Sequence, residues 1–337
     1  MSDKRLQHMT SIGGQAVLEG VMMRGPSKSA IAVRKSDGEI DIETKNNSSL
    51  VAKLKLTKIP ILRGVVAFFD SLIVGVSATM HSAEFIDLEE EEDENAKPSK
   101  FDAFIEKHFG DNMLTIVMWV SVCLSLVIGI GLFMLLPTVI AGGIKSIFIN
   151  ETFIKFPEAF TAAVTPVMTN HIVLNLLEAV TRIAIFILYM VLVSKLKDMQ
   201  RVFEYHGAEH KSIACYEAGA ELTPENAKTF TRFHPRCGTS FLLIVMVVSI
   251  LFFSFLTWDN VWMRMGLRLL LLPVVAGLSY EIIKFAGRSK SGCVAWLTKP
   301  GLWLQRLTTR EPDESQLEVA IASLKAVLPR DGEDDRW

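Results

Sequence analysis

The chain has 337 residues, of which 50% are hydrophobic and 21% are charged, and its mean hydropathy is +0.33. A net charge of −2 excludes a protein that binds nucleic acid through an overall basic field. Four cysteines in a chain of this length exclude a disulfide framework, and the apolar balance is typical of a membrane protein.

The first 58 residues carry signals for β-strands and turns. The stretch "AIAVRKSDGEIDIETK" is two alternating runs around Asp37-Gly38, a dipeptide that favours a two-residue hairpin turn. Such a turn places Val33 opposite Ile42 on one side of the ribbon. We therefore expect a small β-rich segment over residues 1–58.

The stretch "GGQAVLEGVMMRGP", upstream of this ribbon, mixes glycines with apolar residues. It lacks the Lys-Ser/Thr pair of a phosphate-binding loop, so a strand with tight turns is favoured over a ligand loop. Its charged residues are Glu19 and Arg24, which are kept as candidate site residues.

Residues 59–86 form a weaker apolar segment. Because Arg63 and Asp70 interrupt it, we expect an interfacial or bundle-packed helix over Ile61–Met80, with a fifth membrane span as the alternative. Residues 87–100, "DLEEEEDENAKPSK", are dominated by like charges and predict a solvated acidic linker.

Four segments are long and apolar enough to cross about 30 Å of hydrocarbon as helices. Two lie within residues 101–196 and two within residues 239–285: Met113–Leu136, Ile172–Leu196, Thr239–Thr257 and Met265–Phe285. Pro137 is expected to end the first. The predicted fold is an α-helical polytopic membrane protein with about four transmembrane helices, a small β-rich N-terminal cytoplasmic segment and a cytoplasmic helical hairpin.

Lysine and arginine gather on one side of these spans. The segment after the second span and the segment after the fourth are rich in both, whereas the loop after the first span holds only Lys145 and Lys155. Loops rich in lysine and arginine stay in the cytoplasm. We therefore expect a multi-pass protein of the cell membrane whose N- and C-termini and 197–238 segment are cytoplasmic.

The stretch "YHGAEHKSIACYEAG" contains two histidines four residues apart. A helix over Val202–Ala218, ended by Gly219, places four polar side chains on one face: His206, Glu209, His210 and Glu217. Histidines at this spacing can bring two imidazole nitrogens to one ion, here in the order H-x-x-E-H. Glu209 is then placed as a general base, or as an acceptor that orients a ligand.

Two ligands hold zinc poorly, so a site needs at least a third. Thr223 as N-cap and Pro224 at the first helical position predict a second helix that runs to about Phe233. Together with the first helix it forms a predicted helical hairpin over residues 197–238. The hairpin would return the stretch "FHPRCGTS" toward the two histidines.

His234 and Cys237 are the natural additional ligands in that stretch. Thiolate and imidazole both suit zinc, and Cys237 is preferred, with His234 either a ligand or an acid. Arg236, beside them, is placed to stabilise developing negative charge. The alternative for the whole segment is a solvated polar helix leaving a membrane span.

Charged residues inside the predicted spans are a second anomaly. Glu178 and Arg182 are spaced i, i+4 and should pair inside the bundle, because a charge at the centre of a span is unfavourable by about 2.5 to 3.5 kcal/mol. The pair is either structural or part of a substrate path. Glu281 is expected to reach the metal side or to pair with Lys284 or Arg288.

Residues 286–337 predict a cytoplasmic C-terminal segment with an amphipathic helix. Asp313 is the expected N-cap. The helix carries an apolar stripe that should pack on the cytoplasmic domain and is formed by Leu317, Ile321, Leu324 and Leu328.

Five stretches resemble the bacterial YqhQ-like membrane protein family, over nearly the whole chain: "GGQAVLEGVMMRGP", "EYHGAEHKSIACYEAG", "FHPRCGTSFL", "LSYEIIKFAGR" and "PGLWLQRLTTREPDESQLEVAI". The resemblance implies a domain of unknown function described as a metal-dependent enzyme, with no established substrate. The positions here that match such a site are His206, Glu209, His210, His234 and Cys237.

The leading hypothesis is a membrane-embedded, zinc-dependent hydrolase that acts at the cytoplasmic face on a membrane-associated substrate. The expected cofactor is a divalent metal, zinc, and the expected partners are membrane lipids and a membrane-associated substrate or protein, not nucleic acid. One alternative is a non-catalytic scaffold or regulator in which four ligands close a structural metal site. A small transporter is the other.

Overall fold

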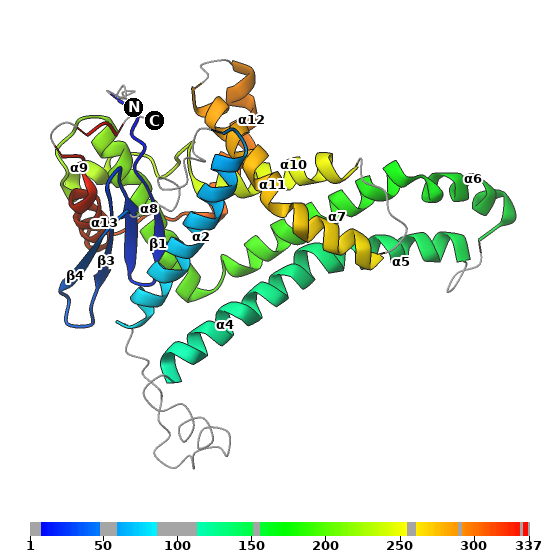
Figure 1. Ribbon diagram of the computed structural model, residues 1–337, viewed down its shortest axis with the longest axis horizontal. Helices are drawn as coiled ribbons and strands as arrows, with labels where there is room; N and C mark the ends of the chain where they lie inside the picture. Colours follow the sequence, from blue (N-terminus) through cyan, green and yellow to red (C-terminus); the bar gives the residue numbers. More distant parts are fainter. Residues whose placement is uncertain are drawn as a thin grey trace, which may run out of the picture. The chain divides into compact units, whose positions relative to one another are not determined.

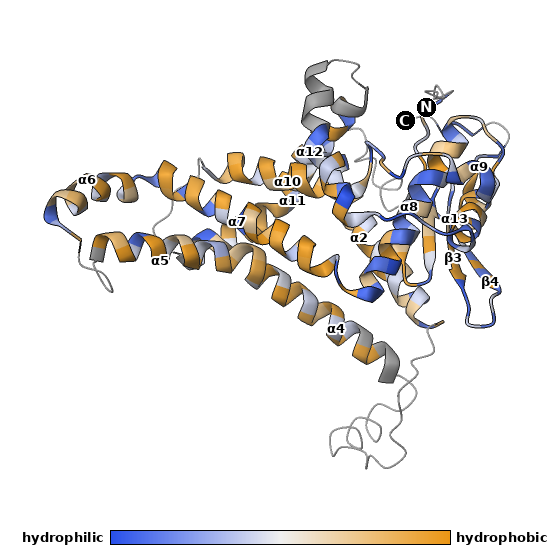
Figure 2. Cartoon of the chain, turned by 180° about the vertical axis from the view of Figure 1, so that it is seen from behind, coloured by the Kyte–Doolittle hydropathy of each residue, from blue (hydrophilic) through white to orange (hydrophobic). Residues whose placement is uncertain are grey.

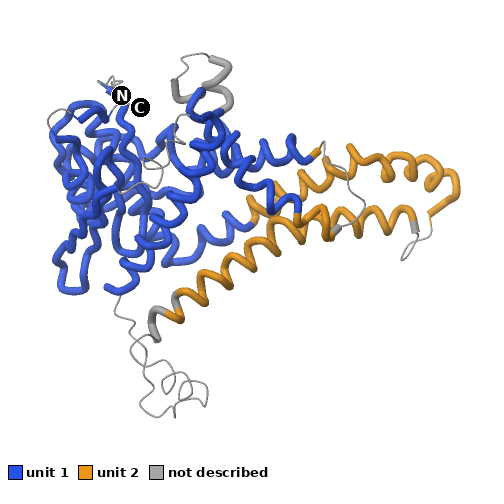
Figure 3. Tube along the Cα trace, in the orientation of Figure 1, with its two compact units in different colours: residues 1–86, 189–253, 267–337 blue, residues 87–188, 254–266 orange. Residues whose placement is uncertain are grey.

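The computed structural model describes residues 8–47, 59–85, 113–150, 156–254, 261–288, 292–330 and 333–335. They form a mostly helical protein with one four-stranded sheet (Figure 1). The chain divides into two compact units, coloured in Figure 3. Unit 1 comprises residues 1–86, 189–253 and 267–337, and unit 2 comprises residues 87–188 and 254–266.

The sheet of unit 1 is an antiparallel meander in chain order, which confirms the β-rich N-terminal segment. Its strands are β1 (Gly13–Val17), β2 (Gly20–Arg24), β3 (Lys28–Arg34) and β4 (Ile40–Asn46). The glycine-rich stretch is a strand with a tight turn, as expected, since Val17 pairs with Gly20. Glu19 lies in that turn with a φ of 50°.

The hairpin of β3 and β4 forms where Asp37-Gly38 predicted it, but its register differs by one residue. Ala32, not Val33, lies opposite Ile42. The turn has three residues instead of two, because the Gly38 N–H bonds to the Lys35 carbonyl and Gly38 takes a φ of 89°. A left-handed glycine after a tight turn adds one residue and shifts the pairing.

The two faces of the sheet are both covered, and alternation along the strands decides which residues face where. Val21, Met23, Ala30 and Ala32 are buried in a core shared with helices α8 (Lys197–Glu217) and α13 (Glu314–Val327). A smaller cluster on alternate positions packs with Ala78 and is formed by Val17, Met22, Ile31 and Val33.

Helix α8 (Lys197–Glu217) begins earlier than the predicted 202 and ends as expected, with Gly219 at a φ of 63°. Helix α9 (Pro224–Lys228) starts at the predicted cap, where Thr223 Oγ1 accepts from the Asn226 N–H. The prediction that α9 runs to Phe233 was wrong. It stops early because Phe230 packs into the core shared by the sheet, α8 and α13.

Helix α13 (Glu314–Val327) confirms the amphipathic C-terminal helix. Asp313 caps it, and Gln316 returns a bond to the Asp313 N–H, so the pair forms a capping box. Leu317, Ile321 and Leu324 of the predicted stripe are buried against the sheet and α8. This helix therefore closes the core that supports α8.

Among the described residues, four helical segments are long and apolar enough to cross a membrane: Leu62–Ala83, Trp119–Ile149, His171–Val193 and Trp262–Phe285. They carry most of the hydrophobic colour in Figure 2. The first is helix α2 (Leu62–Ala83). Its length and composition therefore allow a fifth membrane span, which was the alternative interpretation of this segment. The predicted acidic linker, residues 87–100, lies outside the described residues.

The helical run of the first predicted span does not end at Pro137, which corrects that expectation. It continues as α4 (Met113–Ile130), the π-helix η3 (Gly131–Leu135) and α5 (Leu136–Asn150). A proline lacks the N–H of a regular helix, and the wider turn immediately before it absorbs the change.

The remaining helices are α6 (Glu158–Thr169), α7 (His171–Val193), α10 (Gly238–Ser254), α11 (Val261–Arg288) and α12 (Gly292–Thr308). Helix α10 is apolar but has 17 residues, fewer than the other candidate spans. The predicted third span, Thr239–Thr257, continues from it into residues that the structure does not describe.

Candidate metal centre

Helix α8 places His206 and His210 one turn apart on the same face, with their ring centroids 4.4 Å apart. The intervening Gly207 faces the segment after α12, where an added Cβ would lie 2.0 Å from the Arg310 carbonyl oxygen. Arg310 N–H also bonds to the Phe203 carbonyl at 2.8 Å. A glycine is therefore required here, because the two backbones touch.

Both histidines are oriented by backbone carbonyls. His206 Nδ1 lies 2.8 Å from the Thr308 carbonyl oxygen, and His210 Nδ1 lies 2.6 Å from that of Arg232. A carbonyl only accepts, so each Nδ1 carries the proton and each Nε2 keeps its lone pair. Metal-binding histidines are held in this way.

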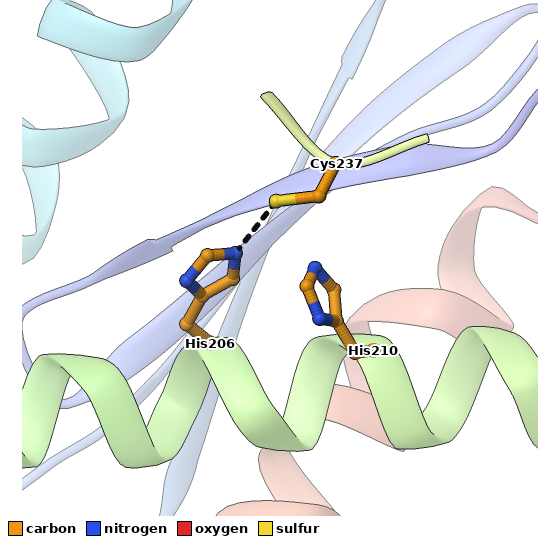
Figure 4. A group of neighbouring side chains, drawn as sticks. All are labelled: His206, His210 and Cys237. Atoms are coloured by element: carbon orange, nitrogen blue, oxygen red, sulfur yellow. Dashed lines mark hydrogen bonds between the residues drawn. The ribbon is translucent and has the colours of Figure 1, made fainter. Parts of the chain in front are cut away.

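Cys237 completes a group of three side chains (Figure 4). Its Sγ lies 3.2 Å from His206 Nε2, and the ligand atoms of His206, His210 and Cys237 all lie within 4.8 Å of one another. The sulfur also lies 3.4 Å from the Thr239 N–H donor, in the first turn of α10. The bend between α9 and α10 thus returns to α8, as predicted.

The donor set fits zinc. Two imidazole nitrogens and one sulfur are ligands that zinc accepts at about 2.0 to 2.3 Å. His210 Nε2 is buried and lacks a hydrogen-bond partner among the described residues. A buried nitrogen without a partner is unfavourable unless something else binds its lone pair, and a metal ion would.

Burial also shifts the pKa values of two neighbouring groups on α8. It lowers the pKa of His210, which favours the neutral ring that a metal ligand requires. It raises the pKa of Glu209, whose side chain lies against Gly14 of β1. Glu209 Oε2 is buried and has no hydrogen-bond partner in the described part of the chain.

His234, Glu217 and Arg236 form a separate polar cluster beside this group. His234 Nε2 lies 3.6 Å from Glu217 Oε2 and 3.2 Å from Arg236 Nη2, and Arg236 also pairs directly with Glu217. Burial alone would raise the pKa of Glu217, but His234 and Arg236 outweigh it, so the pKa is lowered. The structure thus does not bring His234 or Arg236 to the three ligand atoms.

Glu19 and Arg24 belong to neither group. Glu19 pairs with Arg201 of α8 and accepts from the Tyr205 hydroxyl at 3.3 Å, whereas Arg24 pairs with Asp70 of α2. Both residues therefore tie the sheet to helices that flank it.

The charged pair that the sequence predicted within the apolar helix α7 is present. In unit 2, Glu178 Oε1 accepts from Arg182 at 2.9 Å, as the i, i+4 spacing predicted, and it also accepts from Thr138 Oγ1 at 2.9 Å.

The direct partner of Glu281 is neither of the two residues expected, Lys284 and Arg288. Glu281 pairs with Arg63 of α2, with 2.6 Å between Arg63 Nε and Glu281 Oε1. Sequence reasoning did not suggest Arg63, because the two residues are far apart in the chain.

Sequence reasoning missed the groups that support the site. The Thr308 and Arg232 carbonyls are backbone groups, so the residue types at these positions do not reveal their role. Gln305 of α12 accepts from the His234 N–H at 2.9 Å and donates to the His234 carbonyl at 2.7 Å, which holds the bend in place. Its place in the stretch "PGLWLQRLTTREPDESQLEVAI", which resembles the family, is the sequence signal that pointed to it, and the structure buries it fully.

Comparisons with known proteins place the chain in a family. A family model described as "Protein of unknown function (DUF1385)" matches residues 59–330. The chain is 32% identical over 320 residues to the "Uncharacterized protein YqhQ" of Bacillus subtilis (strain 168), covering 94% of this chain and 92% of that protein. No solved structure matches it. The expected resemblance to YqhQ is thereby confirmed, and the chain belongs to the DUF1385 family.

Proposed function

We propose that this protein is a membrane-embedded, zinc-dependent hydrolase whose metal is held by His206, His210 and Cys237. The observation that carries the proposal is the paired orientation of the histidines. Each Nδ1 is fixed by a carbonyl, and both Nε2 atoms lie with Cys237 Sγ inside one 4.8 Å group. Three protein ligands are typical of catalytic zinc, because the fourth position stays open for substrate.

Zinc in such a site supplies Lewis acidity at its open position. Glu209 lies on the helix face that carries the two histidine ligands, and its Oε2 atom has no hydrogen-bond partner among the residues that the structure describes. We therefore assign it the role of proton acceptor. Arg236 and Glu217 hold His234 beside His210, with 5.6 Å between the two ring centroids. We assign His234 the role of proton donor, and Glu217 and Arg236 the role of holding its ring in position.

The site is proposed to face the cytoplasm. The segments rich in lysine and arginine are those that flank α8 and follow α11. The shared core of the sheet, α8 and α13 supports the expectation that both ends of the chain lie on one side of the membrane. A substrate at this site would be membrane-associated, such as a lipid, a lipid-linked intermediate or a peptide segment.

The alternative is a structural metal site in a scaffold or regulator. The observation in its favour is the closeness of His234 to His210, since a small movement of the bend would add a fourth ligand. A closed four-ligand site has no open position and supports no hydrolysis.

The variant Glu209→Gln separates the two. It keeps the shape of the side chain and the proposed ligands but removes the proton acceptor. We expect it to retain metal and thermal stability, and to fail to complement a strain that lacks the gene. Glu221→Gln, the same change at an exposed glutamate of unit 1, is the matched control and should complement. Full complementation by Glu209→Gln would favour the structural alternative.

A further inference from the structure

Helix α2 presents an apolar face that no other described residue covers. Leu62, Phe69, Leu72 and Ile73 are 42%, 47%, 45% and 62% exposed. Their spacing places them on one side of the helix, opposite the buried Gly64, Gly75 and Ala78.

The C-terminal half of α2 lies along the sheet. Ala78, with Val74 and Phe85, packs on the cluster of Val17, Met22, Ile31 and Val33. Gly75 approaches Gln15 of β1 so closely that an added Cβ would lie 2.5 Å from its Oε1 atom. Asp70 pairs with Arg24 of β2, so contact with the sheet extends from residue 70 to residue 85.

The N-terminal end of α2 lies against α11. A Cβ added to Gly64 would meet Gly277 Cα at 2.8 Å, so the two helices cross at a pair of glycines. Arg63 and Glu281 pair one turn away on the same side. The exposed face of α2 therefore begins next to a helix that is itself a candidate span.

The order of the chain limits which helices cross. The sheet and α8 share one core, so they lie on the same side of a membrane, and an even number of crossings must separate them. Three candidates lie between them: α2, the run over residues 113–150, and α7. The stretches between these helices contain no apolar run of about 20 residues, so one of the three does not cross.

Length identifies α2 as the helix that does not cross. Only residues 62–69 precede its contact with the sheet, and they give a helix about 12 Å long. The hydrocarbon layer is about 30 Å thick. The same parity, applied between α8 and α13, requires α10 and α11 either both to cross or both not to cross.

We propose that α2 lies in the membrane–water interface on the side of the sheet, with Leu62, Phe69 and Ile73 inserted among the lipid tails. The bilayer covers this face. The face adjoins α11, which is a candidate span, and exposing its large apolar side chains to water is unfavourable. The inference goes beyond the proposed function and holds whether or not a metal is bound. It also explains how the site meets a membrane, since Gln15 touches α2 and the adjoining Gly14 touches Glu209.

The first experiment tests sidedness. Glu84→Cys, just after α2, and Ser36→Cys, in the hairpin turn of the sheet, are labelled in sealed vesicles with a membrane-impermeant maleimide, before and after permeabilisation. Mass spectrometry of the peptides separates them from the native cysteines. We expect both positions to react from the same side. Labelling from opposite sides would show that α2 crosses, and would overturn the proposal.

The second experiment tests what covers the face. A fluorescent non-natural amino acid replaces Ile73 in the full chain, reconstituted in phosphatidylcholine vesicles, and Glu39 in the hairpin turn is the control. Brominated lipids should quench the probe at Ile73, and aqueous iodide should quench the probe at Glu39. A probe at Ile73 that iodide quenches, or that neither reagent reaches because a second copy covers it, would overturn the proposal. Metal content enters neither readout.

Discussion

His206 Nε2 lies 3.2 Å from Cys237 Sγ, although the two residues come from different elements, helix α8 and the bend before α10. His206 Nδ1 is held on its other side by the Thr308 carbonyl at 2.8 Å. The ring is therefore clamped between the end of α12 and the sulfur. Any change that moves α8, the bend before α10 or the end of α12 should therefore weaken metal binding.

We expect His210→Ala to lose metal and His234→Ala to keep it. His210 presents to the group a buried Nε2 that has no hydrogen-bond partner in the described part of the chain, whereas His234 interacts with Glu217 and Arg236. Removing a ligand should lower zinc affinity by more than the roughly 10- to 100-fold loss that follows removal of an outer hydrogen-bond partner. Competition with a calibrated zinc chelator measures both affinities. Equal losses in the two variants would favour the closed four-ligand site.

Gly207→Ala should weaken both stability and metal binding. The added Cβ would lie 2.0 Å from the Arg310 carbonyl oxygen, so the segment after α12 must move away and take the Thr308 carbonyl with it. Overpacking of this kind costs about 1 to 3 kcal/mol. Thermal unfolding in detergent and chelator competition measure the two effects.

Gly13→Ala is the matched control for that change, because a Cβ at Gly13 meets no heavy atom within 4 Å. It should leave the unfolding midpoint and the zinc affinity close to those of the wild type. A Gly207→Ala variant that behaves like this control would contradict the close contact of α8 with the segment after α12.

Glu217→Gln should destabilise the protein at neutral pH and much less in acid. The pKa of Glu217 is lowered from 4.5 because His234 and Arg236 together outweigh its burial. A carboxyl with a lowered folded pKa stabilises the fold above its unfolded pKa, and this contribution is lost as the pH falls through the folded pKa. Breaking a buried pair should cost about 3 kcal/mol at pH 7.

Unfolding midpoints of the wild type and Glu217→Gln, followed from pH 7 down through the window below about pH 4.5, check this prediction. The gap between the two should narrow as the pH falls. Glu221→Gln, an exposed glutamate, should follow the wild type throughout. A gap that stays constant with pH would show that Glu217 acts through shape and not through charge.

Local chemistry made part of this structure predictable. Asp313 and Gln316 form a capping box from positions three residues apart. Thr223 caps α9 and Pro224 begins it, which is also a local signal. The spacing of His206 and His210 placed both on one face, because a helix fixes that geometry within four residues.

Interactions between distant segments were not predictable in this way. The register of the hairpin depended on whether Gly38 adds a residue to the turn, and the two choices share one sequence signal. The Arg63–Glu281 pair and the packing of α2 on the sheet depend on how elements meet in space. The carbonyls of Thr308 and Arg232 orient the histidines, and a backbone atom leaves no trace in a sequence.

The absorption spectrum of the protein loaded with Co²⁺ in place of zinc tests the central claim most directly. For the wild type, a thiolate-to-cobalt charge-transfer band in the near ultraviolet and the strong visible bands of tetrahedral coordination are predicted. The charge-transfer band should vanish in Cys237→Ser and persist in Cys215→Ser, whose thiol instead donates to the Glu221 carbonyl. A weak octahedral spectrum, the same in all three proteins, would contradict a shared site of His206, His210 and Cys237.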